Sequence, residues 1–432
     1  MTTLARELQS RNHDVVFISL PDGEPSVRAA GLTFLPCAVK EFPAGSVKER
    51  LRWLSKLQGE EALRAMLQNA AARTEAMLDS LPATLAAAAV DAVVLDTVLL
   101  YTELVPISLG IPYAHVANAL HFDYSGYTPP CFYDWPHETT PAALARNRKG
   151  VETFLETLAP VSAVAKAYAK RVGREVDWDN PSATISKLAW ITQTPKAFDF
   201  ESSHWPPQLY HTGPFHDGAG RIQVDFPWER LTGEPLIYAS MGTLLNGVAD
   251  VFRTITEATA QRRGVQLVLS VGDQLDPEQI GPLPSNAILV KRAPQLELLK
   301  RAAVCITHAG LNTVLESLAQ GVPQVAIPVT VDQPGVAARI AEKKTGLFVR
   351  LKDLTVSRLS LLLDQVLNDS TYRDNARHLQ EVIAKTNGLS KAADLLERAF
   401  GRAIEADRSS NNDPIMMSCL SKCEPKWTDS LR

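Results

Sequence analysis

Several features are missing from this sequence, and each absence excludes a class of protein. The chain has 432 residues and contains no run of about 18 apolar residues, so it has no candidate membrane span. Its formal net charge of -4 gives no basic excess, which argues against nucleic acid as a partner. The five cysteines are scattered, and the first residues are too charged for a signal peptide. We therefore expect a cytoplasmic protein without a disulfide framework.

The common phosphate-binding and metal-binding fingerprints are also absent. The sequence has neither a G-x-G-x-x-G loop nor a G-K-[ST] loop. Asp177-Trp178-Asp179 has the D-x-D form that binds metal in some transferases, but no apolar strand precedes it. We interpret it as a solvated turn. Cys419 and Cys423 lack the second ligand pair of a zinc site. No metal and no cofactor are therefore predicted.

Short apolar runs alternate with longer amphipathic stretches, which is typical of parallel sheets covered by helices. The length fits two α/β domains. Strands are predicted at residues 14–20, 91–96, 112–117, 235–240, 265–271, 287–291, 304–307 and 324–328. A long helical stretch is predicted over 47–89.

Composition divides the chain further. Residues 121–140 are rich in aromatics, proline and histidine and predict an irregular loop, either a pocket for an apolar ligand or a packed surface loop. The predicted organisation is an N-terminal domain over 1–215, a linker over 216–234, a C-terminal domain over 235–385, a terminal helix over 386–404 and a disordered tail over 405–432.

The most informative segment is residues 291–339. A strand ending at Thr307 leads into His308-Ala309-Gly310, a tight turn, after which Asn312 and Thr313 begin a helix. The free backbone N–H groups and positive dipole at such a helix start bind a diphosphate well. Glu316 lies one turn further along, where its carboxylate can accept hydrogen bonds from two ribose hydroxyls.

Four pieces of this segment match a known family in order and spacing. They are APQ at 293–295, HAGLNT at 308–313, ESLAQGVP at 316–323 and DQ at 332–333. Together they resemble the donor-binding signature of family 1 glycosyltransferases, the UDP-glycosyltransferases. The stretches 118–135 and 191–200 resemble most the bacterial branch with macrolide and zeaxanthin glucosyltransferases. The resemblance implies the GT-B fold, an α/β architecture of two Rossmann-like domains whose parallel sheets face a cleft.

The resemblance also implies roles for individual residues. The nucleotide-sugar-binding residues would be Thr243, Ala293, Gln295, His308, Gly310, Asn312, Thr313, Glu316, Asp332 and Gln333. Ala293 and Gln295 would contact uracil and ribose, and Glu316 the ribose hydroxyls. Asp332 and Gln333 would bind the hexose. Thr243, His308, Gly310, Asn312 and Thr313 would hold the diphosphate. Arg292 stands where plant members carry a tryptophan that stacks on uracil, which leaves dTDP open beside UDP.

In this family a histidine after the first strand takes the proton of the acceptor hydroxyl, and an aspartate orients that histidine. Asp96 matches the aspartate and is the predicted catalytic residue. The sequence opens on what resembles the family's first helix, so we expect the preceding strand and histidine to be missing. A mistaken start site is the expected explanation, and a degraded gene is the alternative. His115 and His121 are weaker candidates for a substitute base.

Three functions remain open at this point. The first is an inverting hexosyltransferase that moves a hexose from a UDP-sugar to a hydroxyl of a small, largely apolar acceptor. The second is a UDP-sugar-binding protein without turnover. The third is a nucleotide-sugar epimerase of the same fold, against which the position of Asp332 and Gln333 argues.

Overall fold

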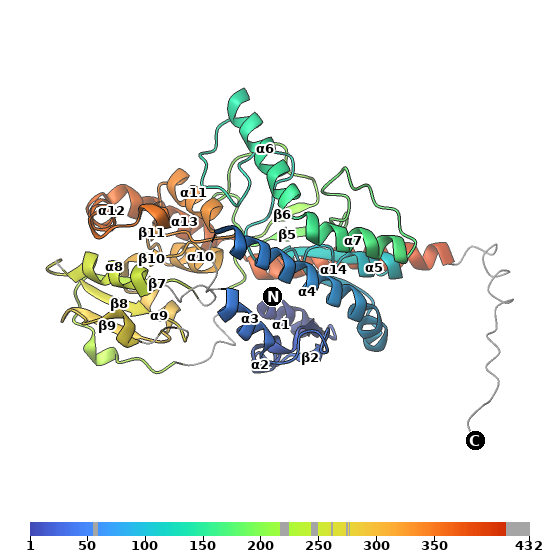
Figure 1. Cartoon of the computed structure of the whole chain (residues 1–432), viewed down its shortest axis with the longest axis horizontal. Coiled ribbons are helices and arrows are strands. Elements are labelled where there is room, and N and C mark those ends of the chain that lie inside the picture. The colour runs from blue at the N-terminus through green and yellow to red at the C-terminus, as the bar shows by residue number, and fades with distance from the viewer. Residues whose placement is uncertain are drawn as a thin grey trace, which may run out of the picture.

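The protein was analysed as a computed structural model, which describes residues 1–54, 59–216, 224–242, 249–260, 262–273, 275 and 277–411. Parallel strands and covering helices form two α/β halves that lie side by side (Figure 1). Among the described helices none is long and apolar enough to cross a bilayer.

The C-terminal half is built on one six-stranded parallel sheet with the strand order β12-β11-β10-β7-β8-β9. Its strands are β7 (Leu236–Ser240), β8 (Gln266–Ser270), β9 (Ala287–Val290), β10 (Ala302–Thr307), β11 (Gln324–Ala326) and β12 (Gly346–Phe348). Its helices are α8 (Ala249–Ala260), α9 (Gln295–Leu299), α10 (Leu311–Ala319), α11 (Gln333–Glu342), α12 (Val356–Asn368) and α13 (Ser370–Ala384). Short 3-10 turns lie at Trp228–Arg230, Pro277–Ile280 and Leu351–Asp353.

Alternation along β7 shows why this sheet is stable. Ile237 and Ala239 pack into the apolar cluster under α8 and α12, whereas Leu236 and Tyr238 pack into the cluster on the opposite face with Leu298 of α9. Every residue of this strand is buried. A central strand that is apolar on both faces is what a doubly covered parallel sheet requires.

The N-terminal half contains two separate parallel sheets, β1-β2 and β3-β4-β5-β6. Their strands are β1 (Val16–Ser19), β2 (Thr33–Pro36), β3 (Val93–Asp96), β4 (Tyr113–Ala117), β5 (Trp190–Thr192) and β6 (Leu209–His211). The helices are α1 (Thr2–Ser10), α2 (Glu24–Ala29), α3 (Ser46–Leu54), α4 (Gly59–Ala88), α5 (Leu104–Leu109), α6 (Pro141–Thr157) and α7 (Ala159–Arg171), with a 3-10 turn at Pro21–Gly23.

The last helix returns to the N-terminal half. Helix α14 (Gly388–Asn411) contributes Ala392, Leu395 and Leu396 to an apolar cluster with β4 and β5. It also packs against α1, although it follows the C-terminal sheet in the chain. The predicted helix over 386–404 therefore starts slightly later and continues to Asn411, so the predicted tail is wrong for residues 405–411. The remainder of that tail, with Cys419 and Cys423, and residues 217–223 of the predicted linker lie outside the described residues.

All eight predicted strands are present, with ends that differ by a few residues. The helical stretch predicted over 47–89 is two helices, α3 and α4. The D-x-D segment forms a turn in which Asp179 N donates to Asp177 Oδ1 at 3.2 Å, as predicted. Residues 118–140 contain no regular element, also as predicted.

Candidate functional site: a nucleotide-sugar edge

The turn between β10 and α10 is shaped around a histidine ring. A Cβ added to Gly242 would lie 2.6 Å from His308 Cε1, and one added to Gly310 would lie 2.4 Å from His308 Nε2. Both glycines therefore make room for the imidazole. Ala309, between His308 and Gly310, has a φ of 64°. This left-handed conformation costs free energy in residues other than glycine. Gly310, which the resemblance places among the nucleotide-sugar-binding residues, is thus also needed for the packing of His308.

His308 is neutral near pH 7. Burial lowers the pKa of its imidazole to about 4, although a hydrogen bond with the backbone of Ser240 opposes the shift. Its Nδ1 atom is buried and has no hydrogen-bond partner among the described residues. A neutral ring of this kind can offer a phosphate an N–H hydrogen bond but no full positive charge.

Helix α10 begins immediately after this turn, and its N-cap residue, Gly310, has no side chain to cap the first turn. The opening N–H groups are consequently open to an anion. Asn312 lies in this first turn, and its Oδ1 accepts a hydrogen bond from Gln193 Nε2 of the N-terminal half at 2.7 Å. The amide N–H groups of Asn312 remain as donors for a phosphate.

Gln295 and Glu316, the residues expected at the ribose, converge on each other and on Thr313, which was expected at the diphosphate. Gln295 Nε2 donates to Glu316 Oε2 at 2.6 Å and lies 3.3 Å from Thr313 Oγ1. Gln295 Oε1 in turn accepts from the hydroxyl of Tyr238 at 3.0 Å. Glu316 is only 3% exposed. Gln295 lies on α9 and Glu316 on α10, so the fold brings together two residues that are 21 positions apart in the sequence.

The residues expected near the uracil base are more exposed than those expected at the ribose. Ala293 is half-buried and packs against the apolar cluster that contains Leu298. Arg292 is exposed, and its guanidinium makes a two-pronged ion pair with Asp273, with Nε 3.1 Å from Oδ1 and 3.0 Å from Oδ2. Arg292, which stands at the position of the plant tryptophan, is therefore engaged by Asp273 in this structure. Thr243 lies outside the described residues.

The hexose end is formed where α11 begins. Asp332 is the N-cap residue of α11, and its Oδ2 accepts from Leu120 N of the N-terminal half at 2.8 Å. Gln333 Oε1 accepts from the backbone N–H groups of Val329 and Thr330 at 2.8 and 3.0 Å. The amide N–H groups of Gln333 are left to contact a ligand. Burial raises the pKa of Asp332, and the hydrogen bond from Leu120 opposes that shift.

Asp96 ends β3 on the N-terminal side. Its Oδ1 accepts from Val98 N at 3.2 Å, and burial raises the pKa of its carboxyl above the ordinary value. The two histidines considered as substitute bases are both occupied. His115 Nδ1 accepts from Ser186 N at 3.1 Å, and its side chain is 6% exposed. The side chain of His121 is completely buried beside Asp199. Neither imidazole faces solvent in this arrangement, which disfavours both as bases.

The aromatic loop has a structural role that its sequence left open. Phe122 and Phe132 stack with Phe154, with ring centroids 4.6 and 4.3 Å from that ring. Phe122 and Phe132 also pack against the apolar cluster of α10, α11 and α13. These rings thus join the two halves.

Comparisons with known proteins agree with this geometry. Residues 225–387 match the family model described as UDP-glucoronosyl and UDP-glucosyl transferase. The chain is 28% identical to a zeaxanthin glucosyltransferase of Pantoea ananas, covering 93% of this chain and 92% of that protein. It is 29% identical to a zeaxanthin glucosyltransferase of Pseudescherichia vulneris, covering 92% and 94%. The solved calicheamicin glycosyltransferase has 22% identity and a TM-score of 0.71, covering 93% and 94%.

The two α/β halves with parallel sheets share the GT-B fold of these solved structures, and the predicted fold is confirmed. The chain is similar to family 1 UDP-glycosyltransferases, most clearly over residues 225–387, and this similarity supports an enzyme that transfers a sugar from a nucleotide sugar. Its resemblance to zeaxanthin and macrolide glycosyltransferases extends to an oleandomycin glycosyltransferase of Streptomyces antibioticus, which is 29% identical over 60% of this chain and 66% of that protein.

Proposed function

We propose that this protein transfers a hexose from a UDP-hexose to a hydroxyl of a small, largely apolar acceptor, with inversion at the anomeric carbon. The observation that carries the donor half is the junction of Gln295, Thr313 and Glu316 beside the uncapped start of α10. This edge offers a carboxylate to ribose hydroxyls and free N–H groups to a diphosphate within one helical turn.

The reaction requires stabilisation of the departing diphosphate. The acceptor oxygen forms a bond to the anomeric carbon while the bond from that carbon to the phosphate oxygen breaks, and UDP leaves with the electron pair. The N–H groups at the start of α10 and the neutral ring of His308 would bind this developing charge, and no metal ion would be needed. Asp96 would orient and stabilise the group that takes the acceptor proton.

Support for an apolar acceptor comes from the surface of the N-terminal half. Trp53 of α3, Met66 of α4 and Val98, two residues beyond Asp96, are exposed by 53%, 43% and 46%. Val98 follows Asp96 by two residues, so an acceptor bound beside Asp96 would meet an apolar side chain there. The named substrates of the zeaxanthin and oleandomycin glycosyltransferases support the same class of acceptor.

Two measurements test this proposal. Calorimetry with UDP and dTDP establishes which nucleotide binds. Incubation with UDP-glucose and a panel of hydroxyl compounds, from long-chain alcohols and phenols to free sugars, establishes transfer. We expect UDP to bind, the apolar acceptors to be glucosylated, and the anomeric proton of the product to show inverted configuration by NMR.

The other outcomes separate the alternatives. Binding of UDP without turnover of any acceptor would favour a binding protein. Conversion of the hexose in the absence of acceptor would favour an epimerase. Preferential transfer to free sugars would contradict the apolar acceptor.

A further inference from the structure

One face of helix α11 is held by the N-terminal half at three successive turns. Asp332 Oδ2 accepts from Leu120 N at 2.8 Å, Gly335 N donates to Cys131 O at 2.9 Å, and Arg339 Nε donates to Asp199 Oδ1 at 2.8 Å. Spacings of three and four residues place 332, 335 and 339 on the same side of a helix. The helix that begins at the hexose end of the donor site is therefore fixed from outside its own domain.

The middle contact leaves no space for a side chain. A Cβ added at Gly335 would lie 2.5 Å from Cys131 O and 2.7 Å from Cys131 Cα. Separations under about 3 Å do not occur between such atoms, so only glycine allows the backbone of α11 to touch the N-terminal half here.

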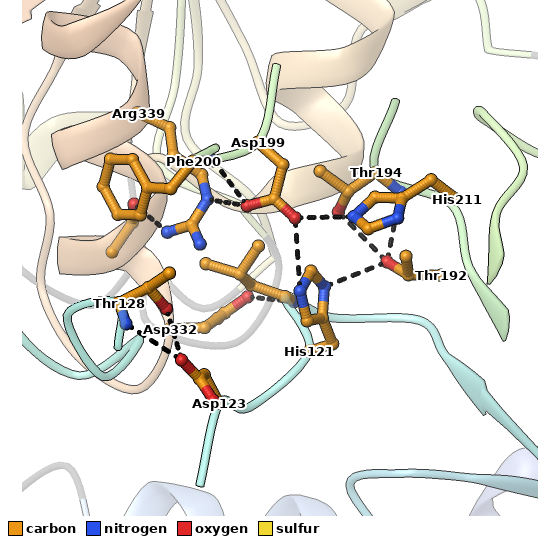
Figure 2. Close-up of polar contacts among 12 residues, drawn as sticks. His121, Asp123, Thr128, Thr192, Thr194, Asp199, Phe200, His211, Asp332 and Arg339 are labelled. Carbon is orange, nitrogen blue, oxygen red and sulfur yellow. Dashed lines mark hydrogen bonds and ion pairs between the residues drawn. The ribbon is translucent and has the colours of Figure 1, made fainter. Parts of the chain in front are cut away.

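The third contact is a fully buried ion pair (Figure 2). The side chains of Arg339 and Asp199 are 2% and 1% exposed, and the guanidinium of Arg339 lies 4.0 Å above the centre of the Phe200 ring. Its Nη1 also donates to Gly335 O at 3.0 Å. Arg339 therefore connects the carboxylate of the N-terminal half to the turn of α11 that carries the glycine.

Two histidines complete the surroundings of Asp199. Its Oδ2 lies 2.8 Å from His211 Nε2 and 3.2 Å from His121 Nε2, as Figure 2 shows. Burial alone would raise the pKa of Asp199, but Arg339 and the histidines outweigh it and hold the pKa well below the ordinary value. The carboxylate stays charged, so the ion pair with Arg339 persists over the whole physiological range.

A metal ion is the main alternative interpretation of this cluster, because His121, Asp199 and His211 offer ligand atoms within 4.8 Å of one another. The guanidinium of Arg339 already compensates the carboxylate of Asp199 from 2.8 Å away. A divalent cation would add two charges next to a buried cation, which is costly without further acidic ligands. The contacts fit a hydrogen-bonded ion-pair network better.

From these contacts we infer that Asp199 and Arg339 form a positioning pair that orients the start of α11, and with it Asp332, for the hexose of the nucleotide sugar. This inference rests on the proposed donor. The pair acts through the rigid helix, because Arg339 lies two turns from Asp332. It also acts through charge: the guanidinium favours the carboxylate form of Asp332, which a buried site would otherwise disfavour. A carboxylate accepts hydrogen bonds from sugar hydroxyls.

The experiment compares a ligand that reaches the hexose end with one that does not. Calorimetry measures the affinities of UDP and UDP-glucose for the wild type and for the double variant Asp199→Asn/Arg339→Met, which removes both charges. We expect the UDP affinity to change less than about twofold and the UDP-glucose affinity to fall roughly tenfold, the effect of weakening one hydrogen bond to a charged group. Arg339→Lys, which keeps the charge, should recover part of the loss.

Gly335→Ala tests the geometry without changing any charge and should produce the same selective loss. Arg350→Met is the matched control, because Arg350 also pairs across the two halves, with Asp134 at 2.5 Å, but is 51% exposed. It should leave both affinities unchanged. Thermal unfolding establishes that each variant is folded.

An unchanged UDP-glucose affinity in the folded double variant would overturn the inference. Equal losses for UDP and UDP-glucose would also overturn it, since they would indicate a general structural role. If the wild type binds neither ligand, the proposed donor itself is wrong, and that result is distinct from the other two.

Discussion

The two halves of the molecule differ in how their strands are arranged and buried. The C-terminal half has six strands in one continuous sheet, and all residues of β7 are buried. The N-terminal half has its strands in two sheets, and all four residues of β1 are only half-buried. The first arrangement carries its own core, whereas the second depends on helices that include α14 from the far end of the chain. We conclude that the donor edge is preorganised and that the opposite side of the cleft is more adaptable.

The sharpest way to test the preorganised edge is to remove one side chain from it. Glu316→Ala should reduce UDP affinity by about 4 kcal/mol, roughly a thousandfold, because two hydrogen bonds to a charged acceptor are lost. Glu316→Gln, which keeps the shape, should lose less. Calorimetry measures both. Glu297→Ala is the control, since Glu297 on α9 pairs with Lys300 at an exposed position. Equal affinities for Glu316→Ala and the control would show that the ribose binds elsewhere.

The second test uses pH to destabilise the donor half selectively. The pKa of His308 is about 4 in the folded protein, below its ordinary value of about 6.5 in the unfolded chain. The folded state therefore binds fewer protons between these values, and stability falls as pH drops from about 6.5 to 4. The loss should reach about 3 kcal/mol. Denaturant unfolding at several pH values measures it.

His308→Gln should remove this part of the pH dependence, because glutamine does not titrate. His13→Gln is the control: His13 is half exposed and lies in the N-terminal half, where it pairs with Glu397 of α14. A pH dependence that persists in His308→Gln would contradict the assigned burial of the ring.

A third measurement compares the two sheets directly. Amide hydrogen exchange should be slower in β7 and β8 than in β1 and β3, with opening free energies that differ by about 2 kcal/mol, or roughly 30-fold in rate. The expected cause is the burial of the first pair of strands on both faces. Similar protection in all four strands would refute the division into a preorganised and an adaptable half.

The same contrast explains what the sequence could predict. The donor edge was predictable because its residues lie within about forty positions, and because a strand, a glycine turn and a helix start each have local signatures. The strands β2, β5, β6 and β12 were missed. They have three or four residues each, and such short runs carry too little periodicity to be distinguished from loops.

The positioning pair was missed for a different reason. Asp199 and Arg339 are 140 positions apart, and no local pattern relates them. One signal was available: Asp199 lies between Phe198 and Phe200, and Arg339 lies in the apolar stretch VAARIA. Charged residues in apolar surroundings are buried only when they are paired. The sequence therefore indicated that each needed a partner, while the fold alone determined which one.

The smallest expected effect concerns the attachment of α14 to the N-terminal half. Arg11, just after α1, contacts Asp394 at 2.6 Å and Glu397 at 3.0 Å on α14, and its side chain is 22% exposed. Arg11→Ala should cost about 1 kcal/mol and lower the melting temperature by about 2 °C, because partly exposed ion pairs are screened by solvent. Arg28→Ala, which breaks an exposed pair within α2, should have no measurable effect. If the two variants have the same melting temperature, the apolar contacts of Leu395 and Leu396 are sufficient to hold α14 in place. The N-terminal half would then be stabilised by the burial of α14 and not by its ion pairs.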